Sequence, residues 1–379
     1  MPAVRSVLIV GAGAAGCATA ILLARAGIAV EVVDRRPDVP SGSGITLQGN
    51  ALRVLRDLGV WPRVEAAGYS FDSLGIRAPD PAATLVAELP DVRTGGPDLP
   101  ATLGLPRADF ASILVDRARE AGARIRWDAD VTDLRDQGGT VAVFFADGST
   151  SHHDLVVGAD GIHSSVRRRI GIDTAPVRTG MGIWRVFGPR PAEVTRTDLV
   201  YGGRCHIAGY CPTGADSLYA YLVEDVQDRG DLDPAQRLAL FKELASSYHG
   251  PWDAIRDGLT EDSPVNYTVF ETHVVEEPWH RGRVVLAGDA AHSCPPTVAQ
   301  GAALALEDAA VLAEVLLAGS DDDLDATLTG YADRRRPRVR TVVDASVQIG
   351  RWMLERTPRE QTDVPGLMRR VASTVAVPA

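Results

Sequence analysis

An apolar run, a glycine-rich turn and a helix open this chain and constrain its fold more than any other feature. Residues 7–10 are continuously apolar, and Gly11, Gly13 and Gly16 follow them in the spacing Gly-x-Gly-x-x-Gly. A helix is predicted after this turn, and residues 30–33 form a second apolar run. This order of strand, helix and strand predicts an α/β fold that binds a dinucleotide on a parallel sheet.

Each glycine has a separate expected role in such a turn. Gly11 permits the tight turn, Gly13 lets a pyrophosphate approach the backbone, and Gly16 lets the helix pack against the strand. Asp34 ends the second strand, 18 residues after Gly16, where a carboxylate can bind the adenosine ribose. Arg35 is a second candidate for this contact. The fingerprint by itself does not distinguish FAD from NAD.

A second unit of strand, turn and helix lies at residues 283–309. An apolar run at residues 284–286 predicts a buried strand, and Gly288 and Asp289 mark a turn after it. An Asp that leaves a strand can bind a sugar hydroxyl. We therefore expect Asp289 to contact the cofactor.

The helix of this second unit is predicted to begin near Gln300, after a turn that contains Pro295 and Pro296. The first N–H groups of a helix have no partner within it and attract negative charge. Gly301 and Ala302 are therefore candidates for a second cofactor contact.

The 14-residue string from Gly288 to Gly301 resembles the second FAD motif of the flavin-dependent aromatic hydroxylases, the para-hydroxybenzoate hydroxylase class. Gly42-Ser-Gly44-Ile is similar to a further family segment, and Asp160-Gly161 is similar to its Asp-Gly motif. The resemblance implies that Asp289 binds the ribityl chain of FAD and that the helix start faces the pyrimidine end of the flavin. The family usually has Glu where this chain has Asp34.

The resemblance also implies site roles for single residues. Arg107 matches an arginine that reaches the ribityl or phosphate region, although an ion pair with Asp109 or Asp116 would also explain it. Val131 falls where relatives place a backbone group beside the adenine. The candidate cofactor-binding residues are Gly11, Gly13, Ala14, Ala15, Gly16, Asp34, Arg35, Gly44, Arg107, Val131, Asp160, Gly288, Asp289, Pro296, Gln300, Gly301 and Ala302.

Catalytic side chains are harder to assign, because the chemistry of such an enzyme belongs to its cofactor. Pro295 and Pro296 are expected to form the wall beside the flavin and to direct a backbone carbonyl towards the substrate, and Gln48 is a further candidate. His292 is expected to be structural. The candidate substrate-binding residues are Trp184, Arg185, Tyr201, Tyr210 and Tyr219. The four cysteines lack the spacing of metal ligands, so no metal site is expected.

The expected fold is a Rossmann-like FAD-binding domain of the para-hydroxybenzoate hydroxylase type, with an antiparallel-sheet substrate domain and C-terminal helices. The FAD-binding domain is expected to be discontinuous, over residues 1–70, 101–174 and 280–345. Residues 71–100 and 175–279 are assigned to the substrate-binding domain, and residues 346–379 to a C-terminal helical segment. Residues 324–355 are predicted to be helical with an interruption at Pro337.

Charge and apolar patterning exclude other classes. A net charge of −11 argues against a nucleic-acid binder. The most apolar predicted helix, residues 302–318, carries Glu307, Asp308 and Glu314, so it is not expected to span a membrane. No signal peptide precedes the first strand, and a cytoplasmic monomer or homodimer is expected.

The resemblance implies an FAD-dependent monooxygenase that uses NADH or NADPH and O₂. Through a flavin hydroperoxide it would hydroxylate a small electron-rich aromatic or N-heteroaromatic molecule. The same chemistry leaves epoxidation and Baeyer–Villiger insertion open. A flavin halogenase or a non-catalytic flavin-binding protein would also carry the N-terminal fingerprint. The Trp-x-Trp-x-Ile-Pro segment expected of a halogenase is not found in this chain.

Overall fold

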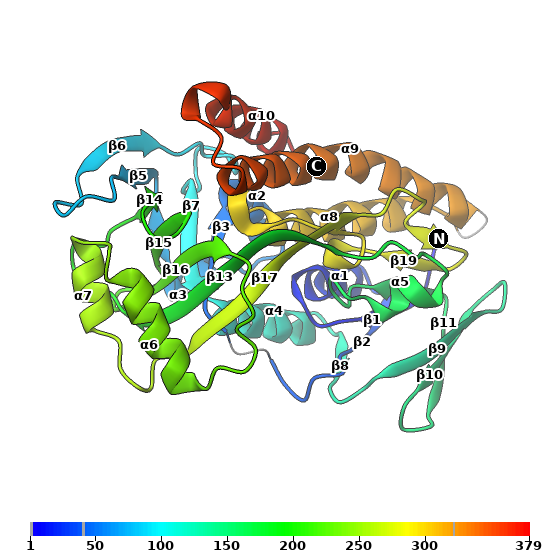
Figure 1. Cartoon of the computed structure of the whole chain (residues 1–379). Coiled ribbons are helices and arrows are strands. Elements are labelled where there is room, and N and C mark those ends of the chain that lie inside the picture. Colours follow the sequence, from blue (N-terminus) through cyan, green and yellow to red (C-terminus); the bar gives the residue numbers. More distant parts are fainter. Residues whose placement is uncertain (1–2, 40–41, 321–322) are drawn as a thin grey trace.

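The computed structural model describes residues 3–39, 42–320 and 323–379, and a six-stranded sheet lies at the centre of one part of it (Figure 1). Neighbouring strands of this sheet are parallel, except for the antiparallel pair β18–β19 at one edge. In sheet order the strands are β18 (His280–Arg281), β19 (Val284–Leu286), β12 (Leu155–Gly158), β1 (Ser6–Val10), β2 (Ala29–Val33) and β8 (Arg124–Arg126). Nearly every residue of β1, β12 and β19 is buried, as their continuous apolar runs predict.

Helices pack around this parallel sheet. Helix α1 (Ala14–Arg25) joins β1 to β2 and packs against α4 (Arg107–Glu120) and α8 (Gly301–Ala318). Helix α9 (Leu324–Leu354) packs on α8, and α10 (Val364–Ala376) packs on α9. The prediction of an interruption at Pro337 was wrong, because α9 is assigned as one helix through that residue.

A second large sheet has eight strands and is antiparallel except where β14 and β5 run parallel. This exception was not predicted. Its strands, in sheet order, are β20 (His292–Ser293), β17 (Val265–Val274), β13 (Val177–Pro189), β16 (Ser217–Asp225), β15 (Ile207–Pro212), β14 (Thr197–Tyr201), β5 (Ser73–Arg77) and β6 (Leu85–Pro90). Helices α6 (Pro234–Ala245) and α7 (Pro251–Asp257) pack on one face of this sheet, where Trp184, Leu222 and Trp252 share one buried cluster.

Two three-stranded sheets, three short α-helices and three 3₁₀ helices, η1 (Gly288–Ala290), η2 (Pro296–Val298) and η4 (Arg359–Gln361), complete the described part of the chain. One sheet contains β3 (Gly44–Gln48), β7 (Thr102–Pro106) and β4 (Tyr69–Phe71), with α2 (Gly49–Asp57) and α3 (Trp61–Ala67) between β3 and β4. The other is a meander of β9 (Val131–Asp136), β10 (Val141–Phe145) and β11 (Thr150–His153) that extends from the body of the molecule in Figure 1. Helix α5 (Ser165–Arg169) follows β12.

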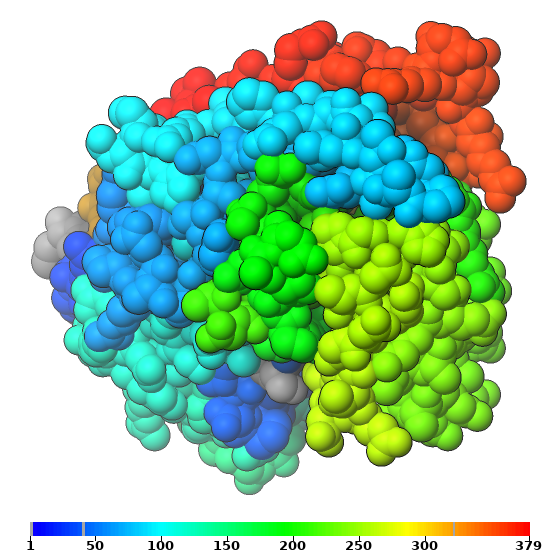
Figure 2. Space-filling view, turned by 90° about the vertical axis from the view of Figure 1, so that its left-hand side faces the viewer, coloured from blue at the N-terminus to red at the C-terminus, as the bar shows by residue number. Residues whose placement is uncertain are grey.

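Segments far apart in the chain meet on the face seen in Figure 2. The light-blue residues of the 71–100 region lie beside the orange and red C-terminal segment and the green residues of the eight-stranded sheet. In the part of the chain that the structure describes, no helix combines the length and the apolarity needed to cross a bilayer.

Candidate active site

Residues from both large sheets and from the C-terminal segment line a cavity of about 1930 Å³. Most of the predicted cofactor and substrate residues line it, although they come from distant parts of the chain. Those that line it are Gly11, Gly13, Ala14, Ala15, Asp34, Arg35, Gly44, Gln48, Arg107, Val131, Asp160, Arg185, Tyr201, Tyr219, Asp289, Pro296, Gly301 and Ala302. Gly16, Trp184, Tyr210, Gly288, Pro295 and Gln300 are absent from its lining.

The glycine turn after β1 has the close contacts that only glycine permits. Gly11 has a φ of +110°, and a Cβ there would lie 2.3 Å from the carbonyl oxygen of Ala159. A Cβ on Gly16 would lie 1.9 Å from the carbonyl oxygen of Gly11. A Cβ on Gly13 would meet no atom within 4 Å, because this residue faces the open cavity. Gly13 is also the N-cap of α1, and no side chain caps this helix. The N–H groups of its first turn are therefore available to a ligand.

Asp34 lies at the end of β2, and protein groups already bind its carboxylate. It accepts hydrogen bonds from the Ala12 amide at 2.9 Å and from Arg36 Nη2 at 2.7 Å. Burial by itself would raise the pKa of Asp34, but the hydrogen bonds from Arg36 and Ala12 hold the pKa below its usual value. Arg35 lines the cavity, as does Arg36, which the sequence analysis did not single out. Two arginines follow Asp34, and only the tertiary structure shows which one binds it.

Asp289 follows β19 at the deep side of the cavity. Among the described residues, no group donates a hydrogen bond to its carboxylate; the residue is exposed and lines the cavity. The surrounding protein raises the pKa of Asp289 by burial, and the nearby positive charge of Arg107 opposes that rise. Gly288 does not line the cavity; it has a φ of +60°, and a Cβ there would lie 2.9 Å from that of Ala15.

Helix α8 begins beside Asp289, and Gly301 and Ala302 line the cavity there. No side chain caps this helix, so its first N–H groups are also available for an anionic or carbonyl group. The side chain of Gln300 is fully buried and turned away from the cavity. It bonds with Gln48 and Asn50, and a cofactor contact by Gln300 stays a prediction.

Three further predicted cofactor residues lie along the same cavity. Arg107 has no carboxylate within ion-pair distance among residues 3–39, 42–320 and 323–379, so the alternative pairing with Asp109 or Asp116 is absent. The carboxylate of Asp160 accepts hydrogen bonds from the start of α5, including one of 2.6 Å from the Ser165 amide. The Val131 carbonyl accepts a hydrogen bond from Arg169 at 2.9 Å.

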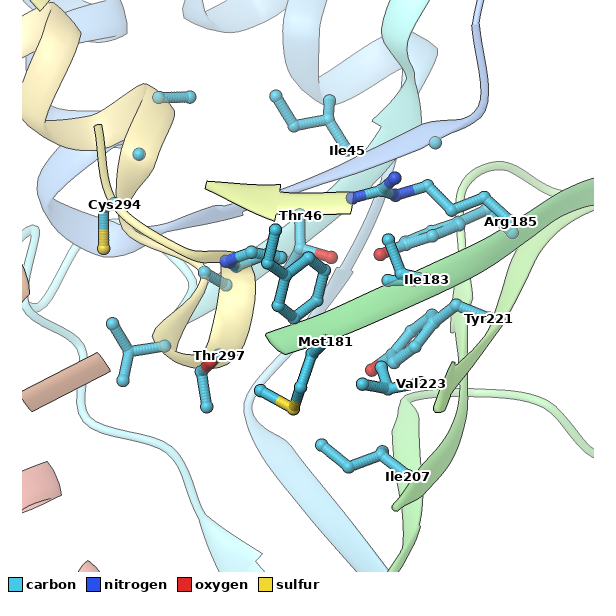
Figure 3. Close-up of a pocket in the computed structure, with 18 of the residues that line it drawn as sticks. Ile45, Thr46, Met181, Ile183, Arg185, Ile207, Tyr221, Val223, Cys294 and Thr297 are labelled. Carbon is cyan, nitrogen blue, oxygen red and sulfur yellow. The ribbon is translucent and has the colours of Figure 1, made fainter. Parts of the chain in front are cut away.

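The eight-stranded sheet provides one wall of the cavity, and the alternation of its strands decides which residues reach it (Figure 3). Arg185 on β13 and Tyr219 on β16 face the cavity. Arg185 Nη1 donates a hydrogen bond to Thr268 Oγ1 at 2.6 Å. Burial raises the pKa of Tyr219 to about 12, so its hydroxyl stays protonated and can donate at neutral pH. Tyr221 stacks on Tyr219 with ring centroids 5.1 Å apart.

Trp184 and Tyr210 are not substrate residues in this structure, because successive side chains of a strand point to opposite faces. Both lie in the core under α6 and α7. Trp184 Nε1 donates a hydrogen bond to Glu224 at 2.8 Å, and the Tyr210 hydroxyl donates one to Asp198 at 2.9 Å. This alternation places Trp184 and Arg185 on opposite faces of β13, but the sequence of residues 181–186 does not show which face borders the cavity.

The two prolines differ in their exposure to the cavity. Pro296 lines it, whereas the Pro295 carbonyl accepts a hydrogen bond of 2.6 Å from Ser346 on α9. The Pro295 carbonyl is therefore already bonded within the protein, and the expectation that this pair directs a backbone carbonyl towards the substrate stays a prediction. Gln48 lines the cavity and donates a hydrogen bond to the Val298 carbonyl at 3.2 Å.

His292 lies outside the cavity in a buried ion cluster, which agrees with a structural role. Its Nε2 is 2.7 Å from Asp308 Oδ2, and the Gly288 amide donates to the same oxygen at 2.8 Å. Arg335 Nε donates to the other Asp308 oxygen at 2.7 Å. Burial by itself would raise the pKa of Asp308, but His292 and Arg335 lower the pKa to about 2. This cluster holds the turn of Asp289 against α8 and α9.

The C-terminal segment lines part of the cavity, although it was expected only to be helical. Ile349, Trp352 and Met353 on α9 line the cavity, as do Val364 and Met368 on α10. Apolar residues recur in α10 at the spacing of one helical face, at positions 364, 367, 368 and 371. This stripe was the available signal that α10 covers an apolar surface.

The residues around the cavity fit FAD. Two uncapped helix starts suit the pyrophosphate and the polar edge of a flavin, and the unpartnered Asp289 suits a sugar hydroxyl. The open space beside Gly13 leaves room for phosphate oxygens. Within the described residues, no group of three or more His, Cys, Asp or Glu side chains could hold a metal ion.

This fold and this site define the class A flavoprotein monooxygenases, the para-hydroxybenzoate hydroxylase-like enzymes that use FAD. The chain matches the FAD-binding domain family over residues 5–346 and belongs to it. It is 32% identical to the putative FAD-dependent monooxygenase YetM of Bacillus subtilis, over 93% of this chain and 95% of that protein.

Two further relatives extend the comparison. The chain is 31% identical to the aurachin C monooxygenase/isomerase of Stigmatella aurantiaca, over 92% of this chain and 90% of that protein. The crystal structure of a variant of 2-methyl-3-hydroxypyridine-5-carboxylic acid oxygenase superposes with a TM-score of 0.80 at 25% identity. That match covers 97% of this chain and 96% of that chain.

Proposed function

We propose that this enzyme hydroxylates a small electron-rich aromatic or N-heteroaromatic molecule, with NADH or NADPH as reductant and O₂ as oxygen donor. One observation carries the proposal: the unpartnered Asp289, the two helix starts and the Arg185–Tyr219 pair face one cavity. The similarity to an oxygenase named for a hydroxypyridine supports a ring of this kind.

The residues of the cavity would divide the work between cofactor and substrate. Gly13, Asp289 and the start of α8 would hold FAD, which supplies the redox chemistry and the activation of oxygen when it is bound. Arg107 would neutralise negative charge near the ribityl chain. Arg185 and the protonated Tyr219 would orient a hydroxyl or oxyanion on the substrate ring. The buried apolar side chains around them would exclude water.

We also propose the division of the chain into a discontinuous FAD-binding part and a substrate-binding part. In its support, every strand of the six-stranded sheet falls within residues 1–70, 101–174 and 280–345. The strands of the eight-stranded sheet fall within residues 71–100 and 175–279, with the exception of β20. We further propose that the protein is cytoplasmic and is a monomer or homodimer; light scattering of the purified protein would test the oligomeric state.

The test of the proposed function is substrate-stimulated oxidation of NADH or NADPH by the FAD-loaded protein. A panel of phenols, aminobenzoates and hydroxypyridines should contain a compound that raises the oxidation rate. Its product should gain one oxygen atom from ¹⁸O₂, detected by mass spectrometry. The proposal is overturned if no compound of the panel stimulates oxidation in protein that holds stoichiometric FAD.

A further inference from the structure

The substrate half of the cavity contains an apolar chamber, defined here by Met181, Ile183, Ile207, Val223 and Phe270. These five side chains are buried and form one cluster, separate from the core that α6 and α7 cover. All five line the cavity. Figure 3 shows four of them, Met181, Ile183, Ile207 and Val223, beyond Arg185 and opposite Thr46 and Thr297. A substrate that passes the Arg185–Tyr219 pair therefore meets an aliphatic surface.

Three charged side chains that line the cavity near these strands, those of Arg77, His206 and Glu224, have partners within the protein. Arg77 pairs with Asp198 at 2.6 Å, and His206 Nε2 lies 3.0 Å from Asp225. Glu224 accepts the hydrogen bond of Trp184 and pairs with Arg229. These contacts occupy the charged groups nearest the apolar chamber, whereas Arg356 and Arg359 line the cavity beside the C-terminal segment.

The chamber continues to an apolar rim, defined here by Val86, Leu89, Tyr201 and Met368. These residues line the cavity, yet between 38% and 60% of each is exposed. They come from β6, β14 and α10; in Figure 2 the light-blue region that contains β6 lies between the red C-terminal segment and the green residues. Exposed apolar side chains that border a cavity are a common feature of ligand-binding grooves.

We infer that the substrate is amphipathic, with a polar aromatic ring at the Arg185–Tyr219 pair and an unbranched aliphatic tail that fills the apolar chamber and leaves at the rim. The inference rests on the proposed function for the place of the ring and adds the tail. A flexible aliphatic chain suits this space, because it buries apolar area along the whole path and needs no polar partner.

The test measures binding, so that it does not depend on turnover. The FAD-loaded enzyme is titrated with phenol and with 4-ethyl-, 4-butyl-, 4-hexyl- and 4-octylphenol, and flavin difference spectra report the Kd. We expect the Kd to fall by roughly threefold to fourfold for each added CH₂ until the chamber is full. A Kd that does not fall with chain length overturns the inference. The proposed function is judged separately, by oxygen incorporation into any ring compound.

Matched variants locate the tail. Val86→Asp places a charge at the rim, whereas Val177→Asp changes a valine of similar exposure, 63% against 60%, that does not line the cavity. We expect Val86→Asp to weaken the binding of 4-octylphenol by about tenfold and that of phenol by less than twofold. Val177→Asp should change neither.

A second pair tests the other side of the rim. Met368→Asp should weaken the binding of the long compounds, and Val377→Asp, at an exposed apolar residue outside the cavity, should not. Equal effects within both pairs, or effects independent of chain length, would show that no tail lies at this rim and would overturn the inference.

Discussion

At the scale of single residues, the site depends on groups that the protein leaves without partners. Asp289 is a carboxylate with no hydrogen-bond donor among the described residues, and Gly13 is a residue with open space where a side chain would be. Both features leave groups of the protein available to a bound molecule. Asp34 differs, because Arg36 already binds its carboxylate.

Gly13→Val should prevent FAD binding without unfolding the protein. The new side chain would enter the cavity beside the start of α1, and the φ of −83° at Gly13 is acceptable for valine. The ratio of flavin to protein absorbance should fall to background, with an almost unchanged Tm for the FAD-free protein. Gly330→Val on α9 is the control, since a Cβ there also meets nothing within 4 Å and lies outside the cavity. Stoichiometric FAD in Gly13→Val would contradict the role of this turn.

Asp289→Ala should weaken FAD binding by roughly tenfold to a hundredfold, the usual range for a lost hydrogen bond to a charged group. The free energy of unfolding of the FAD-free protein should not fall, because no protein group loses a partner. Fluorescence titration with FAD and urea unfolding measure the two quantities. Unchanged FAD affinity would remove Asp289 from the site.

The raised pKa of Asp289 adds a pH dependence with a definite sign. In FAD-free protein the folded state holds this proton more tightly than the unfolded state, so its contribution to stability is complete below about pH 3.8. That contribution is lost as the pH rises through the folded pKa. The Asp289→Ala variant should lack this loss. Its free energy of unfolding, relative to that of the wild-type protein, should therefore rise with pH, and urea unfolding at several pH values would measure this.

At the scale of elements, two strand–turn–helix units present their helix starts to one cavity. The buried cluster of His292, Asp308 and Arg335 joins the turn of the second unit to α8 and α9. Glu307 extends the cluster to Arg338 and Asn50. Rigid support of this kind holds Asp289 and the start of α8 in a fixed geometry.

Arg335→Met should destabilise the protein by about 3–5 kcal/mol, because it leaves the buried Asp308 and Glu307 without a shared cation. Arg334→Met is a matched control on the same helix. Arg334 forms a partly exposed pair with Glu314, so its loss should cost less than about 1 kcal/mol. Equal losses in urea unfolding would show that the buried cluster contributes no more than the surface pair.

Acid unfolding gives the same cluster a second test. The pKa of Asp308 is lowered to about 2, so the stability it contributes is complete above about pH 3.8 and is lost as the pH falls towards 2. This loss is on the order of 2 kcal/mol. Arg335→Met should show a smaller loss across that range, since one of the groups that lowers the pKa is gone.

At the scale of the whole molecule, the cavity joins parts of the chain that are hundreds of residues apart. Gly11, Gly44 and Asp289 line it together, and the C-terminal segment covers its apolar side. A cofactor that fills the cavity would therefore link the two large sheets. Stability should then depend on FAD as well as on the core.

FAD should raise the free energy of unfolding by about 2.7 kcal/mol at a free concentration of one hundred times its Kd. Hydrogen exchange should slow together in three segments that contribute most of their residues to the cavity lining, residues 11–15, 44–48 and 298–302. Helix α6 lies outside the lining and provides the reference. Protection confined to residues 11–15 would mean that the second unit does not contact the cofactor.

The sequence by itself determined the two strand–turn–helix units, the glycine roles and the family resemblance. These features depend on the order and spacing of neighbouring residues, which fix backbone turns and helix starts locally. For the same reason Gly11, Gly13 and Asp289 could be selected without coordinates. The alternation in β16 was also readable, since it has a period of two residues.

Only the tertiary structure decided which side of a strand faces the cavity and which of several neighbours completes a contact. In the structure, Trp184 and Tyr210 lie in the core, Arg36 donates hydrogen bonds to Asp34, and the Pro295 carbonyl accepts one from Ser346. The tertiary structure also brought α10 to the cavity, which the sequence analysis had left without a role. Apart from the local contact of Asp34 with Arg36, these outcomes depend on contacts between residues distant in the chain. No local spacing encodes which distant surface a side chain will meet.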